Sequence, residues 1–185
     1  MAQADGEMLT TTLVPACPGG PVLIYAISGL GKSTLAATHP TRVLDADEFL
    51  NRAVEAAFPE LTSRSRLLAW RELCGRRPWV EGGPALQTWA SVRRAFTEPL
   101  VAAMRSGNHA VVVTSLLKPP WVVSAYYGVE RGRYMEHLEL AGRKVDNKQS
   151  EAMNNRLDGY SPLIRLGPGQ FLAERREIRE LVGGM

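Results

Sequence analysis

Short apolar runs alternate with amphipathic stretches along this chain, and the alternation predicts strands that alternate with helices. The apolar runs predict five strands, at 22–25, 41–44, 109–114, 122–127 and 163–166. The stretches between them predict helices at 33–37, 48–57, 61–79, 85–105, 131–141, 151–157 and 173–182. Because strands that alternate with helices pair in parallel, this order predicts an α/β fold: a three-layer sandwich with helices on both faces of a five-stranded parallel sheet.

The chain of 185 residues fits one domain with a substantial core, spanning 1–185. Within it we distinguish a loose, turn-rich arm at 1–20, an insert at 60–95 and a region at 128–160 after the fourth strand. Hydrophobic residues make up 45% and charged residues 22%, as is typical of soluble globular proteins. The polar start is unlike a signal peptide, and no apolar run approaches the roughly 20 residues that cross a bilayer. Two cysteines are too few for a disulfide framework, so we expect a soluble, cytoplasmic protein without a membrane partner.

The first predicted strand runs into a loop with the spacing [AG]-x-x-x-x-G-K-[ST], which is typical of phosphate-binding P-loops. Such a loop aims backbone N–H groups at one point, where Lys32 would reach the β- and γ-phosphates and the Ser33 hydroxyl would ligate Mg²⁺. Ala26 replaces the first glycine of the strict pattern and still leaves room for a phosphate. The alternative is a glycine-rich turn that binds nothing. We predict that ATP and Mg²⁺ are bound by Ala26, Ile27, Ser28, Gly29, Leu30, Gly31, Lys32, Ser33 and Thr34.

Two acids one residue apart, Asp45 and Asp47, follow the second predicted strand. We expect this strand to lie next to the first, which would turn both carboxylates toward the γ-phosphate at the carboxyl edge of the sheet. We assign Asp45 to Mg²⁺ and Asp47 to orienting or deprotonating an acceptor hydroxyl. The alternative for Asp47 is an N-cap of the helix that begins at Glu48. The third strand ends at Thr114 and Ser115 with no acid, which argues against a motor-type or GTPase-type hydrolase.

Phosphoryl transfer spreads negative charge over the transferred group, and cations that close over it are expected after the fourth strand. We predict Arg143 as the main lid cation and Arg131 as the second, with a solvated helix face as the alternative for each. Arg133 and Lys144 add basic charge to the same region. His137, on the same predicted helix, is interpreted as a partly exposed residue without a catalytic partner.

The insert at 60–95 is basic and contains several tryptophans. From Thr62 to Arg94 it has seven arginines against two acids, with Trp70, Trp79 and Trp89 interleaved. Guanidinium groups neutralise phosphates and indoles stack on unpaired bases, so this composition predicts a surface that binds nucleic acid. The alternative is that the tryptophans belong to the core and the arginines to a solvated face.

The P-loop motif, the Asp45-Ala46-Asp47 string and the arginines near 131–144 resemble the P-loop kinases of the nucleoside-monophosphate and thymidylate kinase superfamily. The strings at 25–34, 43–47 and 136–143 are similar to kinases of tailed bacteriophages, in particular to the 5-hydroxymethyl-deoxyuridine DNA kinases. The resemblance implies a P-loop kinase-like fold. It also implies phosphorylation of the hydroxymethyl group of 5-hydroxymethyluracil in DNA, a step in thymidine hypermodification, in the cytoplasm of an infected bacterium.

We therefore expect an ATP-dependent kinase that phosphorylates a hydroxyl group on a base of DNA. A deoxynucleoside monophosphate kinase acting on free nucleotides is a second hypothesis, and it needs no polymer. A non-enzymatic, ATP-dependent DNA-binding module is a third, and it predicts DNA binding with a steep salt dependence. Both kinase hypotheses require Lys32 for phosphoryl transfer.

Overall fold

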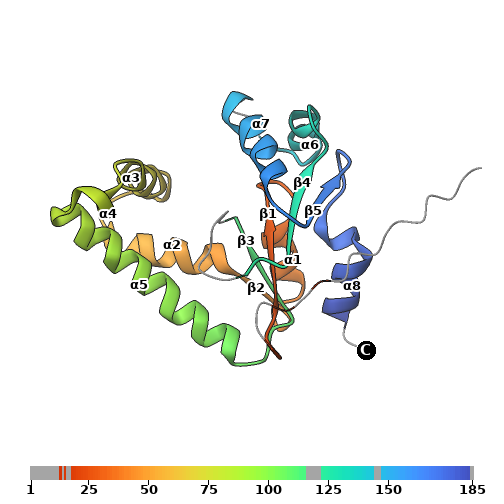
Figure 1. The fold of residues 1–185 in the computed structure, drawn as a ribbon, viewed down its shortest axis with the longest axis horizontal. Helices are drawn as coiled ribbons and strands as arrows, with labels where there is room; N and C mark the ends of the chain where they lie inside the picture. The colour runs from red at the N-terminus through yellow and green to blue at the C-terminus, as the bar shows by residue number, and fades with distance from the viewer. Residues whose placement is uncertain (1–12, 14, 16–17, 116–121, 144–146, 184–185) are drawn as a thin grey trace, which may run out of the picture.

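The computed structural model describes residues 13, 15, 18–115, 122–143 and 147–183. Five parallel strands form one sheet in the order β2-β3-β1-β4-β5 (Figure 1). The strands are β1 (Val22–Ala26), β2 (Val43–Asp45), β3 (Val111–Thr114), β4 (Ala125–Val129) and β5 (Leu163–Leu166). The parallel sheet confirms the predicted fold class. One detail of the prediction is wrong: β3 lies between β1 and β2, so β2 is not the neighbour of β1.

Helices lie on both faces of this sheet and complete a three-layer α/β sandwich of the P-loop kinase-like type. They are α1 (Lys32–Thr38), α2 (Ala46–Ala57), α3 (Ser63–Gly75), α4 (Pro78–Glu81), α5 (Gly83–Arg105), α6 (Tyr134–Leu140), α7 (Asn147–Arg156) and α8 (Arg176–Gly183). Leu23 and Val112 pack against α2 and α5 on one face. Ile24 and Val113 share the core of the opposite face with α1 and α8. Successive strand residues point to opposite faces, which explains why buried strands that are apolar at every position suit this arrangement.

The carboxyl ends of the strands meet at one edge of the sheet, at the top of Figure 1. Tyr25 of β1 is in register with Thr114 of β3, and Asp45 of β2 with Val113. The residues that follow β1, β2 and β3 therefore leave the sheet at the same edge, where α6 and α7 also lie. The loop after β1 and the acids Asp45 and Asp47 therefore lie at this edge.

Several helix and strand boundaries differ from the predictions, and two of the differences follow from the local backbone conformation. The helix expected over 61–79 is interrupted at Arg77, whose φ of 52° is left-handed, and Pro78 then begins α4. The helix expected from 131 begins at Tyr134, because Gly132 with a φ of 71° turns the chain first. Strand β4 lies at 125–129 instead of 122–127.

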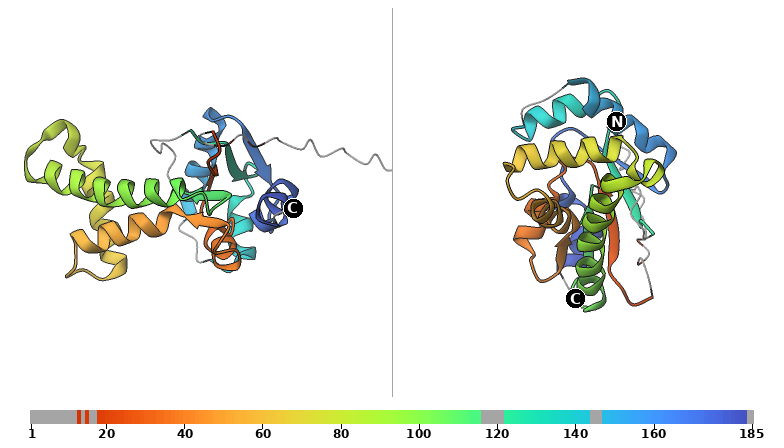
Figure 2. Two further views of the ribbon diagram at one scale, coloured as in Figure 1. Left: turned by 90° about the horizontal axis from the view of Figure 1, so that it is seen from below. Right: turned by 90° about the vertical axis from the view of Figure 1, so that its left-hand side faces the viewer.

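The insert at 60–95 forms α3, α4 and the first half of α5. Together with the end of α2, these helices build a lobe that projects away from the sheet (Figure 2). The lobe is joined to the sheet by α5, which buries Val92, Phe96, Leu100 and Met104 at intervals of one helical turn against α2 and the sheet. Among the described residues, no helix has the length and apolar character needed to cross a membrane. The arm predicted at 1–20 lies mostly outside the described residues.

Candidate functional site

The loop Ala26–Gly31 between β1 and α1, here called the glycine loop, requires glycine at two positions. Gly29 and Gly31 have φ values of 92° and 83°, which side-chain-bearing residues rarely adopt. A Cβ at Gly29 would also lie 2.8 Å from Leu138 Cδ2, closer than two carbons can approach. The positive φ values explain why both positions are glycine, and the close contact with α6 is a second reason at Gly29.

Lys32, the first residue of α1, has only 8% of its surface exposed. Its Nζ donates to the carbonyl oxygens of Ala26 at 2.9 Å and of Ile27 at 3.5 Å, so the side chain folds back across the glycine loop. Burial lowers the pKa of Lys32, and the carboxylates of Asp47 and Asp45 oppose that shift. The ammonium group therefore lies inside the loop within the field of both predicted acids.

Ser33 and Asp45 are in direct contact. The Ser33 hydroxyl donates to Asp45 Oδ2 at 3.0 Å, while Asp45 Oδ1 accepts from the backbone N–H of Asp47 at 3.0 Å. Asp45 is 4% exposed, and its pKa is raised by burial and by the charge of Asp47. A hydroxyl beside a buried carboxylate fits Mg²⁺, which prefers oxygen ligands and would offset the buried charge. In the described part of the chain no three acidic, histidine or cysteine side chains cluster as metal ligands, so water and phosphate oxygens would have to complete the shell.

Asp47 connects the first turn of α2 to the end of β3 by hydrogen bonds. Its Oδ1 accepts from the backbone N–H of Ser115 at 2.9 Å and from the Thr114 hydroxyl at 3.5 Å. The N-cap of α2 is Asp45, so the alternative that makes Asp47 the cap is wrong. The helix begins at Ala46, two residues earlier than predicted, because Asp45 accepts the N–H of Asp47. Both acids thus lie at the carboxyl edge of the sheet, on the side of Lys32.

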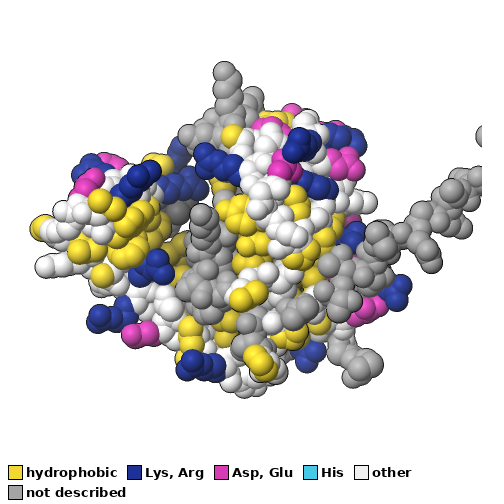
Figure 3. Space-filling model, viewed as in Figure 1, with side chains coloured by type: hydrophobic (Ala, Val, Ile, Leu, Met, Phe, Trp, Pro, Cys, Tyr) yellow, Lys and Arg dark blue, Asp and Glu magenta, His cyan; other side chains and the backbone are white. Residues whose placement is uncertain are grey.

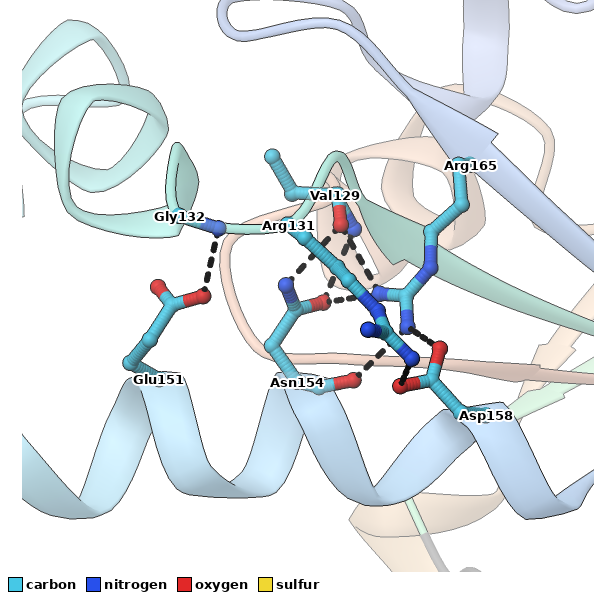
Figure 4. A network of polar contacts seen from close by, with 7 residues as sticks. All are labelled: Val129, Arg131, Gly132, Glu151, Asn154, Asp158 and Arg165. Atoms are coloured by element: carbon cyan, nitrogen blue, oxygen red, sulfur yellow. Dashed lines mark hydrogen bonds and ion pairs between the residues drawn. The ribbon is translucent and has the colours of Figure 1, made fainter.

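The two predicted lid arginines occupy different surroundings. Arg143 is exposed, and its Nη1 donates to Ser28 Oγ at 2.8 Å, so this guanidinium reaches the glycine loop. Arg131 instead forms an ion pair with Asp158, which also pairs with Arg165 (Figure 4). The structure therefore brings Arg143, and not Arg131, into contact with the loop among the residues it describes. Lys144 lies outside the described residues.

His137 contradicts the interpretation of a partly exposed residue, because it is completely buried behind the glycine loop. Its Nε2 lies 3.1 Å from the carbonyl oxygen of Gly29, and its Nδ1 accepts from the backbone N–H of Gly169 at 3.1 Å. One turn earlier, the Tyr134 hydroxyl donates to the carbonyl oxygen of Ser28 at 2.7 Å. The sequence signal was the i, i+3, i+4 spacing of Tyr134, His137 and Leu138, which places the histidine on the buried face of α6.

Asn154 links helix α7 to the turn that leads from β4 into α6 (Figure 4). Its side chain is fully buried, donates to the carbonyl oxygen of Val129 at 2.9 Å and accepts from the N–H of the same residue at 3.0 Å. Arg165 donates to Asn154 Oδ1 at 2.8 Å and to Asp158 Oδ1 at 2.7 Å. The sequence interpretation did not include this network, since its members come from segments that lie apart in the sequence.

On the projecting lobe, the tryptophans are divided between core and surface. Trp70 packs partly buried against the core shared by α2 and α5. Trp79 is 49% exposed, and its ring centroid lies 5.3 Å from that of Trp89. The Arg93 guanidinium lies 5.0 Å from the Trp89 ring centre, a cation–π contact. An aromatic pair, with one ring exposed and the other half-buried, therefore lies on the lobe next to a guanidinium.

Comparison with protein-family models, with curated proteins and with solved structures gives no match for this chain. The chemistry of the site therefore has to be argued from its own geometry.

Proposed function

We propose that this protein is an ATP- and Mg²⁺-dependent kinase that transfers the γ-phosphate to a hydroxyl group. The observation that carries the proposal is the 3.0 Å hydrogen bond from Ser33 Oγ to Asp45 Oδ2, next to the buried Lys32. It joins the first turn of α1, directly after the glycine loop, to an acid at the end of β2, which is the combination that a bound triphosphate and its metal ion require.

Each residue has a role that follows from its position. The Lys32 ammonium would neutralise the β- and γ-phosphates, and Ser33 and Asp45 would hold Mg²⁺, which supplies further positive charge at the phosphate oxygens. The acceptor oxygen forms a bond to the γ-phosphorus while the bond from that phosphorus to the β-bridging oxygen breaks, and ADP leaves. Asp47 orients the acceptor hydroxyl and takes its proton. Arg143, next to Ser28, would balance the charge on the transferred group.

As acceptor we propose the hydroxymethyl group of 5-hydroxymethyluracil in DNA. The partly exposed Trp79–Trp89 pair and Arg93 support a nucleic-acid substrate, because indoles stack on bases that have left the duplex and guanidinium groups pair with phosphates. The arginines of α3 and α5 that are exposed, among them Arg64, Arg71 and Arg94, add positive charge to the same lobe.

The test offers γ-labelled ATP and Mg²⁺ with four acceptors in parallel: DNA containing 5-hydroxymethyluracil, unmodified DNA of the same sequence, free deoxynucleoside monophosphates and free 5-hydroxymethyl-deoxyuridine. We expect label on the modified DNA only, located by mass spectrometry on the hydroxymethyl oxygen. The matched control is Lys32→Ala, which should lose transfer by several orders of magnitude.

Each other outcome contradicts a defined part of the proposal. Equal labelling of unmodified DNA would exclude specificity for the modified base. Formation of nucleoside diphosphates would indicate a kinase of free nucleotides. Salt-dependent DNA binding without label on any acceptor would indicate an ATP-dependent DNA-binding module.

A further inference from the structure

Tyr25 carries a buried hydroxyl group without a hydrogen-bond partner in the described part of the structure. Its side chain is completely buried at the end of β1, one residue before the glycine loop. The two other fully enclosed tyrosines are satisfied: Tyr134 donates to the Ser28 carbonyl oxygen and Tyr127 to Glu177 Oε1. A buried donor that has lost water and gained no partner is uncommon in folded proteins and needs a physical reason.

The hydroxyl lies among the groups of the candidate site. Tyr25 is in register with Thr114 of β3 and Tyr126 of β4, so all three side chains leave the same face of the sheet. The Thr114 hydroxyl donates to Asp47 Oδ1 at 3.5 Å, which places the proposed base on this face. Burial raises the pKa of Tyr25 well above its usual range, and the charges of Tyr134, Asp47 and Tyr160 raise it further. Residues of β3, β4, α2 and α6, together with Tyr160, thus lie around Tyr25.

Tyr25 continues into a row of aromatic rings that reaches the surface. Its ring centroid lies 5.7 Å from that of Tyr126, and the Tyr126 centroid lies 4.7 Å from that of Tyr160. Tyr126 and Tyr160 are only partly buried, so part of each residue remains accessible. Hydrophobic side chains line both sides of the hollow between the projecting lobe and the sheet (Figure 3). Partly exposed aromatic faces of this kind stack on flat aromatic ligands.

We propose that Tyr25, Tyr126 and Tyr160 form the wall that receives the aromatic base carrying the acceptor hydroxyl. Tyr126 and Tyr160 stack against the base, and the Tyr25 hydroxyl donates a hydrogen bond to a carbonyl oxygen on its edge. The base thereby supplies the partner that Tyr25 lacks, and its hydroxymethyl group comes to lie beside Asp47. This inference rests on the proposed kinase function and assigns the acceptor subsite within it.

Two tyrosine-to-phenylalanine variants separate this role from a structural one. Tyr25→Phe removes a hydroxyl without a protein partner, so the thermal midpoint should stay equal or rise. Tyr127→Phe, the control on the opposite face of the neighbouring strand, removes a hydroxyl bonded to Glu177 at 3.1 Å and should lower the midpoint. For an oligonucleotide with one 5-hydroxymethyluracil, Tyr25→Phe should raise KM about tenfold, equivalent to about 1.4 kcal/mol, and leave KM for ATP unchanged. Tyr127→Phe should change neither KM.

A binding measurement makes the inference independent of turnover. Fluorescence anisotropy with the same labelled oligonucleotide should show about tenfold weaker binding for Tyr25→Phe. Tyr160→Ala should weaken binding by a similar factor, and Tyr160→Phe, which keeps the ring, should restore it. If the wild-type protein labels no acceptor, the proposed function fails. A different result overturns the tyrosine wall while the kinase proposal stands. In that case the wild-type protein labels the modified DNA, but Tyr25→Phe leaves KM and affinity for the oligonucleotide unchanged, or lowers the thermal midpoint as Tyr127→Phe does.

Discussion

His137 Nε2 lies 3.1 Å from the carbonyl oxygen of Gly29, and this contact joins helix α6 to the middle of the glycine loop. Because His137 Nδ1 accepts from the N–H of Gly169, the ring proton resides on Nε2 and is donated to Gly29. One neutral side chain therefore connects the loop after β1 with the loop after β5. The shape of the glycine loop depends on groups 108 and 140 residues further along the chain.

We expect His137→Phe to loosen the glycine loop. The variant keeps an aromatic ring in the buried space and leaves the Gly29 carbonyl and the Gly169 N–H without partners, at a cost of about 2–4 kcal/mol in the free energy of unfolding. Differential scanning calorimetry should show a thermal midpoint lower by about 5–10 °C. At temperatures where the variant is still folded, its KM for ATP should rise by a larger factor than its kcat falls, because His137 acts by holding the glycine loop.

The control for His137→Phe is Glu139→Gln, which changes an exposed side chain on the same helix. This control should leave the thermal midpoint and KM for ATP as in the wild type. A His137→Phe protein with unaltered KM for ATP would show that the loop holds its shape without the histidine.

Features that depend on neighbours in the sequence were predictable. Strand β5 begins and ends at the predicted residues, 163 and 166, and the motif from Ala26 to Ser33 forms the expected turn from strand to helix. Both depend on local apolar runs and on glycine conformation. The carboxyl-edge position of Asp45 and Asp47 also follows from parallel strands alone.

Features that depend on distant contacts were not predictable. Insertion of β3 between β1 and β2 depends on how a crossover connection of more than 60 residues, from α2 to α5, returns to the sheet. The cap at Asp45 and the burial of His137 depend on backbone groups whose positions only the fold defines. The missing hydrogen-bond partner of the Tyr25 hydroxyl could not be inferred either. A position within an apolar strand does not reveal which groups surround the end of its side chain.

Asp45→Asn should abolish magnesium-dependent transfer without destabilising the fold. Asparagine retains an oxygen for the N–H of Asp47, and it removes a charge whose burial is unfavourable. Because burial and Asp47 raise the Asp45 pKa, the folded protein binds more protons than the unfolded chain at this group. The stability that comes from this difference is fully present below the unfolded pKa, near 3.9, and is lost as pH rises through the folded value.

Thermal midpoints of the wild type and Asp45→Asn, measured from about pH 4 to pH 8, check this prediction. The variant should be at least as stable as the wild type at neutral pH, and its advantage should shrink toward acid pH. A variant that is clearly less stable at neutral pH would mean that the Ser33–Asp45 hydrogen bond outweighs the burial of the charge.

Arg143→Ala should reduce kcat by about a hundredfold, a typical effect of losing one charged donor to the transferred phosphate. Its side chain is exposed and contacts Ser28 Oγ at 2.8 Å, so the thermal midpoint should change little. Arg131→Ala is the informative comparison, because Arg131 pairs with Asp158 and should affect kcat less. Steady-state assays with saturating ATP compare kcat of the two variants. An equal loss of kcat in both would indicate that Arg131 is also a lid cation.

Asp158→Asn should weaken the attachment of α7 to the turn before α6. Hydrogen bonds from Arg165 and Arg131 lower the Asp158 pKa, so the folded protein gains stability above the unfolded pKa and loses it as pH falls through the folded value. The variant should therefore have a lower thermal midpoint than the wild type at pH 7, and the difference should vanish in acid. Glu180→Gln, which breaks an exposed ion pair with Arg176 on α8, is the control and should have little effect at any pH. If both variants behave alike, the Asp158 pair contributes no more than a surface ion pair, and the attachment of α7 depends on the buried Asn154.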